Sequence, residues 1–157
     1  MPAMPSFIVF DLDFTLWDAG GTWCDQLAPP FSRQQRRVLD RDGAQICLYP
    51  DVMRVLDWCC EQGLLLALAS RTYEPAWAKC LLDLLEIRDR FAYEEIYPSS
   101  KARHFKALKK QTGYAYDQML FFDDETRNIQ EVGQLGVNAV QLDNGVTWDI
   151  FASAMGH

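Results

Sequence analysis

The hydrophobic residues of this chain gather in short runs that alternate with longer amphipathic stretches. The first run is Phe-Ile-Val-Phe at residues 7–10, and further strand-like segments lie at residues 64–69, 93–97, 119–122 and 137–142. Short apolar runs without a polar face are typical of strands that are buried on both sides. The stretches between them carry apolar residues at helical spacing, which predicts helices at residues 50–62, 74–85 and 101–112, before Gly136 and at the C-terminal end.

Local signals mark where several of these helices begin and end. Gly63 follows the first helix as a stop signal, and Ser99 or Ser100 can cap the helix that Gly113 ends. Strands that alternate with helices form βαβ units with right-handed crossovers. The pattern therefore predicts an α/β fold whose parallel sheet is covered by helices on both faces.

The segment between the first strand and residue 49 interrupts this alternation. Asp42-Gly43 lies between two short β-prone arms, which is a strong signal for a β-hairpin. We expect a small β-flap here, within an insertion at about residues 18–48, that hangs near the end of the first strand. The flap carries four arginines: Arg33, Arg36, Arg37 and Arg41. We interpret them as a solvated face of the hairpin, and the alternative is that they guide anionic substrates to the site.

Composition narrows the class of protein. The chain has 157 residues, 49% of them hydrophobic, and a net charge of −7, which suits one packed domain over residues 1–157 and argues against nucleic-acid and acidic-membrane partners. No apolar run reaches the roughly 20 residues that cross a bilayer. The first five residues lack the features of a signal peptide, so we expect a cytoplasmic location.

Cysteine and histidine do not form a metal or disulfide pattern. The five cysteines are odd in number and lack a C-x-x-C pair, so they are expected to be small buried hydrophobes in a reducing compartment. His104 and His157 are too few and too far apart to build a metal site or a triad with them.

Polar side chains recur where the predicted strands end. Acids follow the first and fourth strands, a hydroxyl ends the second, and a lysine lies just beyond the third: Asp11 and Asp13, Asp123 and Asp124, Ser70, and Lys101. The carboxyl ends of parallel strands share one edge of a sheet, where ligands bind. Each residue alone has an ordinary explanation as a turn, a cap or a lysine at an exposed helix start, but together they favour a single site.

This set of residues suits phosphoryl transfer. Carboxylates are the ligands that Mg²⁺ takes from proteins, together with waters and substrate phosphate. A serine hydroxyl and a lysine ammonium suit the oxygens of a transferring phosphoryl group. One carboxylate then remains to attack phosphorus and another to move a proton.

The residues and their order resemble the four motifs of the haloacid dehalogenase (HAD) superfamily of phosphohydrolases, and most closely its eukaryotic-type magnesium-dependent phosphatase branch. The resemblance spans about residues 7–142. It is carried by Asp11-Leu12-Asp13-Phe14-Thr15-Leu16-Trp17, Ser70-Arg71-Thr72, Ile96-Tyr97-Pro98 with Ser100-Lys101 and His104-Phe105, and Phe121-Phe122-Asp123-Asp124-Glu125 with Arg127-Asn128-Ile129. Ser99 departs from the pattern, since glycine is expected there.

The resemblance implies a Rossmann-like, three-layer HAD-type fold with a short β-flap instead of a cap domain. It also implies phosphatase activity that requires Mg²⁺ and passes through a phosphoaspartyl intermediate. Asp11 would be the nucleophile and Asp13 the general acid/base, while Ser70 and Lys101 would hold the phosphoryl group with Arg71 beside them. The implied metal ligands are Asp11, Asp13 through its backbone carbonyl, and Asp124, with Asp123 helping through water.

Several functional alternatives stay open at this point. Phosphotyrosine-type or sugar-phosphate monoesters, free or bound to protein, are the expected substrates of a monomeric enzyme, and small metabolites are the nearest alternative. Polynucleotide ends suit the acidic chain less well. A phospho-aspartate receiver domain has a similar set of residues, but its nucleophile lies in mid-chain and its lysine comes last. A catalytically silent binding module of the same fold would not need every reactive side chain.

Overall fold

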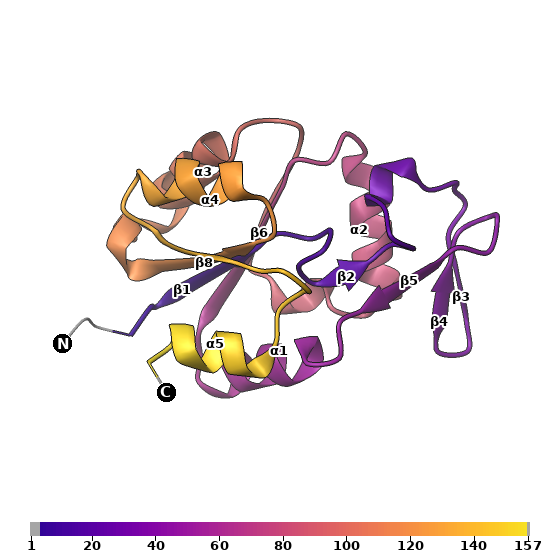
Figure 1. Cartoon of the computed structure of the whole chain (residues 1–157), viewed down its shortest axis with the longest axis horizontal. Coiled ribbons are helices and arrows are strands. Elements are labelled where there is room, and N and C mark those ends of the chain that lie inside the picture. Colours follow the sequence, from indigo (N-terminus) through magenta and orange to yellow (C-terminus); the bar gives the residue numbers. More distant parts are fainter. Residues whose placement is uncertain (1–3, 157) are drawn as a thin grey trace.

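The computed structural model describes residues 4–156 and is built on one parallel sheet (Figure 1). Residues 1–3, which belong to the N-terminal segment without signal-peptide features, lie outside this range, as does His157. The sheet contains β1 (Phe7–Phe10), β6 (Leu65–Ser70), β7 (Tyr93–Ile96), β8 (Met119–Asp123) and β9 (Asn138–Gln141). Its spatial order is β7-β6-β1-β8-β9, and every pairing is parallel, as predicted. From β1, the chain first adds β6 and β7 on one side of the sheet and then adds β8 and β9 on the other side. The boundary between β1 and β8 is therefore the switch point where open α/β sheets bind ligands.

The residues of β1 alternate between two hydrophobic cores. Phe7 and Val9 belong to one cluster, whereas Ile8 and Phe10 belong to the other. Successive side chains of a strand point to opposite faces, so each face of β1 is covered. All four residues are fully buried, which explains why the strand shows no polar alternation in the sequence.

Helices cover both faces of the sheet, which completes the predicted three layers (Figure 1). Helices α3 (Lys101–Thr112) and α4 (Thr126–Gly133) contribute to the core that contains Phe7. The opposite core receives α1 (Val52–Glu61), α2 (Pro75–Leu84) and α5 (Trp148–Ala154). The predicted caps of α3 are confirmed, because Ser100 Oγ accepts a hydrogen bond from the Arg103 amide and Gly113 ends the helix at φ 77°.

The flap is a four-stranded antiparallel sheet in the order β2-β5-β4-β3. Its strands are β2 (Trp17–Asp18), β3 (Ser32–Gln34), β4 (Arg37–Leu39) and β5 (Gln45–Leu48). The predicted hairpin is β4-β5, in which Val38 pairs with Ile46. The two outer strands were not expected, because they have too few residues to show a periodic pattern.

The flap packs against the domain through buried side chains. Val38 and Ile46 are buried, as are Cys24 and Leu27 in the segment before the hairpin, and all four join the core that contains Phe10. Burying these side chains removes apolar surface from water and anchors the insertion to the sheet. Its four arginines are exposed, and Arg33 donates to the Leu84 carbonyl oxygen at 2.8 Å.

The cysteines divide between core and surface. Cys24 and Cys59 are buried, as expected, but Cys47, Cys60 and Cys80 are exposed, and that part of the expectation was wrong. These three lie on the outward sides of β5, α1 and α2, next to buried neighbours. The cysteines are all free thiols. Among the described residues, no helix is both long and apolar enough to span a bilayer.

Gly145, in the loop before α5, lies so close to Tyr49 that adding a side chain should disturb the packing. A Cβ built on Gly145, at φ 72°, would lie 2.2 Å from Tyr49 Cγ, whereas a Cβ on Gly113, at φ 77°, meets nothing within 4 Å. We therefore expect Gly113→Ala to cost about 1 kcal/mol of unfolding free energy, since only the backbone is strained. Gly145→Ala should cost roughly 1–3 kcal/mol more, since the Tyr49 ring must also move. Urea unfolding measures both, and equal losses would contradict the packing argument.

Candidate active site

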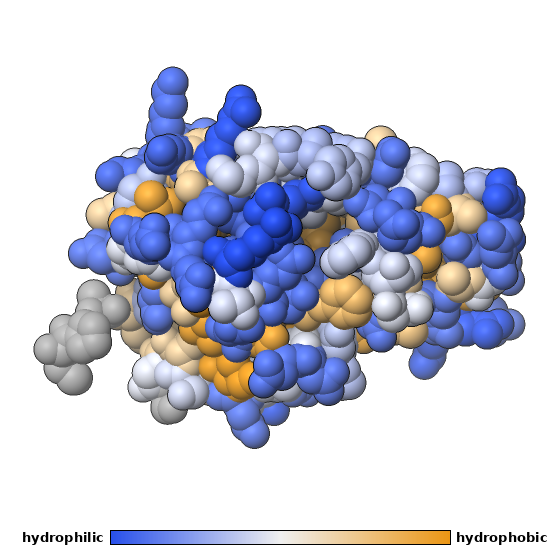
Figure 2. Space-filling model, turned by 45° about the horizontal axis from the view of Figure 1, so that its top comes forward, coloured by the Kyte–Doolittle hydropathy of each residue, from blue (hydrophilic) through white to orange (hydrophobic). Residues whose placement is uncertain are grey.

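A cavity opens at the carboxyl edge of the sheet, next to the switch point between β1 and β8. Its volume is about 160 Å³, several times the roughly 15 Å³ that one water requires. Figure 2 shows this face, hollowed near its middle with strongly hydrophilic residues beside the hollow. The lining combines acids, cations, hydroxyl groups and two aromatic rings: Asp11, Asp13, Trp23, Asp25, Ser70, Arg71, Thr72, Tyr73, Lys101, Asp124, Glu125, Arg127 and Asn128.

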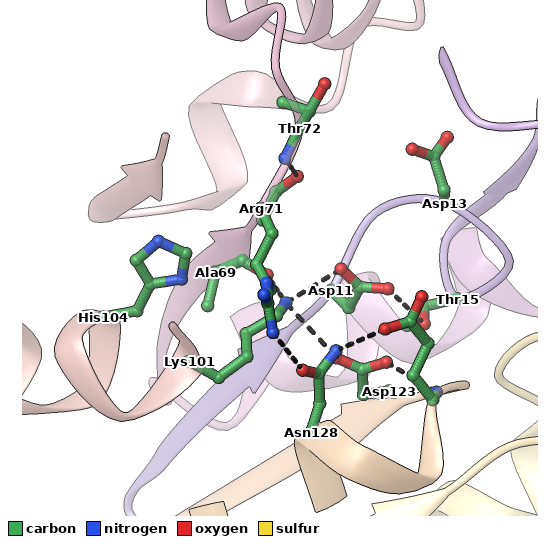
Figure 3. Close-up of polar contacts among 12 residues, drawn as sticks. Asp11, Asp13, Thr15, Ala69, Arg71, Thr72, Lys101, His104, Asp123 and Asn128 are labelled. Carbon is green, nitrogen blue, oxygen red and sulfur yellow. Dashed lines mark hydrogen bonds and ion pairs between the residues drawn. The ribbon is translucent and has the colours of Figure 1, made fainter. Parts of the chain in front are cut away.

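Lys101 lies at the centre of the polar contacts, with only 1% of its surface exposed (Figure 3). Its Nζ donates to Asp11 Oδ1 at 2.9 Å and to the Ala69 carbonyl oxygen, and it pairs with Asp123 Oδ2 at 3.2 Å. The ordinary explanation of Lys101 as a lysine at an exposed helix start is therefore wrong for this side chain. Side chains lean toward the N-terminus of a helix, so one in the first turn of α3 can reach the strand ends.

Asp11 is held in place from three directions. Its amide donates to the Phe122 carbonyl oxygen at 3.0 Å, which continues the ladder between β1 and β8. Its Oδ1 accepts from Lys101, and its Oδ2 accepts from Thr15 Oγ1 at 3.3 Å. Burial raises the pKa of Asp11 well above its ordinary value, and Asp123 raises it further, while Lys101 acts in the opposite direction.

Asp13 lies apart from this cluster although it is two residues from Asp11 (Figure 3). Its Oδ1 accepts hydrogen bonds from Trp17 Nε1 at 2.7 Å and from the Cys24 amide at 2.9 Å. Burial raises the pKa of Asp13 to about 6, and both of these hydrogen bonds oppose that shift. The two carboxyl groups of the Asp-x-Asp motif therefore have different environments and different partners.

Three carboxyl groups converge where a metal ion would be expected. One oxygen from each of Asp11, Asp123 and Asp124 lies within 4.8 Å of the others. Burial, followed by the charge of Asp123, raises the pKa of Asp124 to about 7. A divalent cation would relieve this repulsion, and hard oxygen donors of this kind suit Mg²⁺. The residues present therefore fit the metal that the resemblance implies, although the carboxylate of Asp13 is not part of the group.

Asp123, the first acid of the second pair, is oriented by Asn128, a buried residue at the start of α4. Asn128 Nδ2 donates to Asp123 Oδ2 at 3.1 Å, and its Oδ1 accepts from Arg71 at 3.1 Å. The Glu125 amide donates to Asp123 Oδ1 at 2.8 Å. Asn128 belongs to the fourth sequence motif but had no predicted role, because residue type alone does not show which partners an amide bridges.

The structure also brings the predicted phosphate-binding residues to the cavity. Ser70 ends β6, is 3% exposed, and its Oγ accepts from the Thr72 amide at 3.3 Å. Arg71 lies beside it and reaches across to α4 through Asn128. His104 is buried outside the cavity lining, where its Nε2 contacts the Tyr97 carbonyl oxygen at 3.0 Å.

The fold and this edge define a class of protein. A parallel sheet that presents Asp-x-Asp, a serine, a lysine and a second acid pair in this order is characteristic of HAD-superfamily hydrolases. A family model described as Acid Phosphatase matches residues 3–157. The chain belongs to this acid phosphatase family, in the magnesium-dependent phosphatase branch of the superfamily.

Individual comparisons agree with this assignment. Magnesium-dependent phosphatase 1 of Homo sapiens is 43% identical over 148 residues, which cover 93% of this chain and 82% of the human protein. A HAD-superfamily hydrolase from Ehrlichia chaffeensis matches with a TM-score of 0.71 at 13% identity, covering 96% of each chain. A HAD family enzyme from Bacteroides thetaiotaomicron, solved with magnesium and inorganic phosphate, matches with a TM-score of 0.68 at 13% identity, covering 93% of this chain and 98% of that one.

The burial of Lys101 predicts a large effect on stability. Lys101→Met leaves Asp11 and Asp123 without their shared cation, and loss of one partner from a buried ion pair typically costs about 3–5 kcal/mol. Lys106→Met is the matched control, because Lys106 is exposed on the same helix, and it should change stability by less than about 0.5 kcal/mol.

Urea unfolding in EDTA measures both variants without a bound metal. The loss in Lys101→Met should be larger at pH 8 than at pH 5, because burial raises the pKa of Asp11 and its protonation at low pH removes a charge that the lysine no longer neutralises. Equal stability of the two variants at both pH values would contradict the central role of Lys101 in the folded state.

Proposed function

We propose that this protein is a Mg²⁺-dependent phosphomonoesterase that uses Asp11 as its nucleophile. The observation that carries the proposal is the placement of Asp11, whose carboxylate is fixed between Lys101 and Thr15 at the cavity. A fixed nucleophile avoids the entropy cost of orienting the attacking group. In the first half-reaction, a carboxylate oxygen of Asp11 bonds to phosphorus as the bond to the leaving oxygen breaks.

Asp13 is the proposed carrier of the proton in both half-reactions. It protonates the leaving oxygen, and its carboxylate then removes a proton from the water that hydrolyses the aspartyl phosphate. Both hydrogen bonds that fix Asp13 reach Oδ1, which leaves Oδ2 for the proton. Proton transfer of this kind contributes about 10²–10⁴-fold to the rate.

Most of the acceleration must have another source, because phosphate monoesters require up to ~10²¹-fold. We assign it to charge stabilisation by Lys101, Ser70 and Arg71, which meet the phosphoryl oxygens. Arg71 is held toward the cavity by Asn128, so its guanidinium is positioned before substrate binds.

Mg²⁺, when bound, neutralises charge on the phosphoryl oxygens and helps to align them with the nucleophile. We propose Asp11 and Asp124 as its carboxylate ligands and the backbone carbonyl of Asp13 as a third. Asp123 has a supporting part, because its oxygens already contact Lys101, Asn128 and the Glu125 amide. The carboxylate of Asp13 stays free for proton transfer.

The sheet order separates this proposal from the receiver-domain alternative. Receiver domains have the flavodoxin-like strand order 2-1-3-4-5. Numbering only the strands of the main sheet along this chain gives the order 3-2-1-4-5. The receiver interpretation is therefore rejected on topology as well as on the chain order of its reactive residues.

The substrate is proposed as a class of phosphomonoesters, together with the location and oligomeric state of the enzyme. We propose phosphotyrosine-type or sugar-phosphate monoesters, free or protein-bound, with small-metabolite monoesters as the nearest alternative. The acidic chain suits an enzyme without nucleic-acid or membrane partners, acting as a cytoplasmic monomer. The flap takes the place of a cap domain, so a bulky leaving group can enter.

The metal requirement gives a direct test. Hydrolysis of p-nitrophenyl phosphate should fall to background in EDTA and return with excess Mg²⁺ but not with Ca²⁺, which prefers more ligands and looser geometry. Phosphate release is the measurement, and the circular dichroism spectrum in EDTA serves as the control for folding. Undiminished turnover in EDTA by the folded protein would contradict the metal assignment.

Substituting Asp11 and substituting Asp13 should block different steps of the reaction. Asp11→Asn should form no covalent phosphoenzyme, since a neutral amide does not attack phosphorus. Asp13→Asn keeps the nucleophile, so with a good leaving group it should give a small burst followed by near-arrest, with phosphate trapped on Asp11.

Rapid acid quench and mass spectrometry locate the trapped, hydroxylamine-sensitive phosphate. Phosphate on any residue other than Asp11 would overturn the proposed nucleophile. Steady turnover by Asp13→Asn would remove the acid/base role, while leaving Asp11 as the nucleophile.

A further inference from the structure

The exposed aromatic residues of this protein gather at one place. All its Phe, Tyr and Trp residues lie in the described part of the chain, and only Trp23 and Tyr73 among them are exposed, at 52% and 77%. Both line the cavity that contains Asp11, although 50 positions separate them in the sequence. A single exposed aromatic residue needs no explanation, but two at the mouth of one cavity suggest contact with a ligand.

The backbone segments that carry the two rings are fixed to each other. Cys24 Sγ lies 3.7 Å from Thr72 Oγ1, and the Tyr73 amide donates to Asp25 Oδ2 at 3.3 Å. The first contact joins the residue after Trp23 to the residue before Tyr73, and the second joins Tyr73 itself to the segment that follows Trp23. The segments that carry Trp23 and Tyr73 are therefore held in position before a ligand arrives, which lowers the entropy cost of binding.

The same segment is fixed to the residue that handles the proton. Trp23 precedes Cys24, whose amide donates to Asp13 Oδ1 at 2.9 Å. In an in-line displacement the leaving oxygen lies opposite the nucleophile and must reach the proton carrier. A leaving group that meets Asp13 would therefore leave the cavity on the side where Trp23 lies.

We infer that Trp23 and Tyr73 form an aromatic rim that binds the leaving group and selects phosphomonoesters whose leaving group contains a ring. This inference rests on the proposed function. Aromatic side chains offer a flat apolar face, against which an aryl ring or the C–H face of a sugar ring can pack. The acidic side chain of Asp25, in the same lining and next to the Tyr73 amide, disfavours leaving groups with additional negative charge on that side.

The test compares three monoesters: phenyl phosphate, glucose 6-phosphate and acyclic glycerol 1-phosphate. kcat/KM is measured with Mg²⁺ for the wild type, Trp23→Ala, Tyr73→Ala and the double variant. We expect the double variant to lose about tenfold or more on at least one ring substrate, which is the lower part of the range for loss of an aromatic stack. The acyclic ester should change by less than twofold, because it does not reach the rim.

Two further sets of variants make the comparison specific. Trp23→Phe and Tyr73→Phe keep a ring and should recover most of the lost kcat/KM. Met53→Ala removes an exposed apolar side chain from α1, away from the cavity lining, and should leave all three substrates unchanged. Circular dichroism and urea unfolding check that each variant is folded.

The possible outcomes are distinct. A loss confined to phenyl phosphate identifies an aryl leaving group, and a loss confined to glucose 6-phosphate identifies a sugar. Equal losses on all three esters, or no loss on any of them, would overturn the inference. Failure of the proposed function would appear differently, as absence of Mg²⁺-dependent turnover of every ester by the wild type.

Discussion

The active-site edge depends on one buried cation shared by two carboxylates. Lys101 Nζ contacts Asp11, which directly follows the first strand of the main sheet, and Asp123, which ends the fourth, so one side chain pairs with both acids at the switch point. Without the lysine, burial would drive Asp11 further toward its neutral form, and a neutral Asp11 would be a poor nucleophile. The same contact therefore supports the folded state and favours the charged form of the proposed nucleophile. This coupling explains why a lysine with a proposed role in catalysis is as buried as a core residue.

Asp11 and Asp13 obtain different roles from their surroundings. Asp11 lies between Lys101 and other acids, where burial and Asp123 raise its pKa and the lysine opposes that shift. Asp13 lies in a separate site made by Trp17 and the Cys24 amide, where burial raises its pKa to about 6. Two carboxyl groups of equal intrinsic acidity thus acquire different environments for the proposed roles of nucleophile and proton carrier, because a pKa depends on burial and on nearby charges.

Much of this arrangement could be predicted from the sequence. Buried strands such as residues 7–10 and the capped helix α3 have strong local signals, and the strand ends indicated which polar residues would meet. The environment of a side chain has no such signal. The burial of Lys101, the separation of Asp13 and the packing of Val38 against the core all depend on contacts between segments distant in the sequence. Short strands such as β2 and β3 were also missed, because pairing rather than periodicity defines them.

The flap shows how a small chain can recognise a leaving group without a cap domain. Its first part, around Cys24, contacts Asp13 through a backbone amide and the loop after β6 through a side chain. Buried residues such as Val38 anchor the rest of the flap to the main core. The positions of Asp13, the proposed proton carrier, and of the aromatic rim are therefore set by the same few contacts. A leaving group held against this rim would be aligned with Asp13 at the same time, so recognition and proton transfer would improve together.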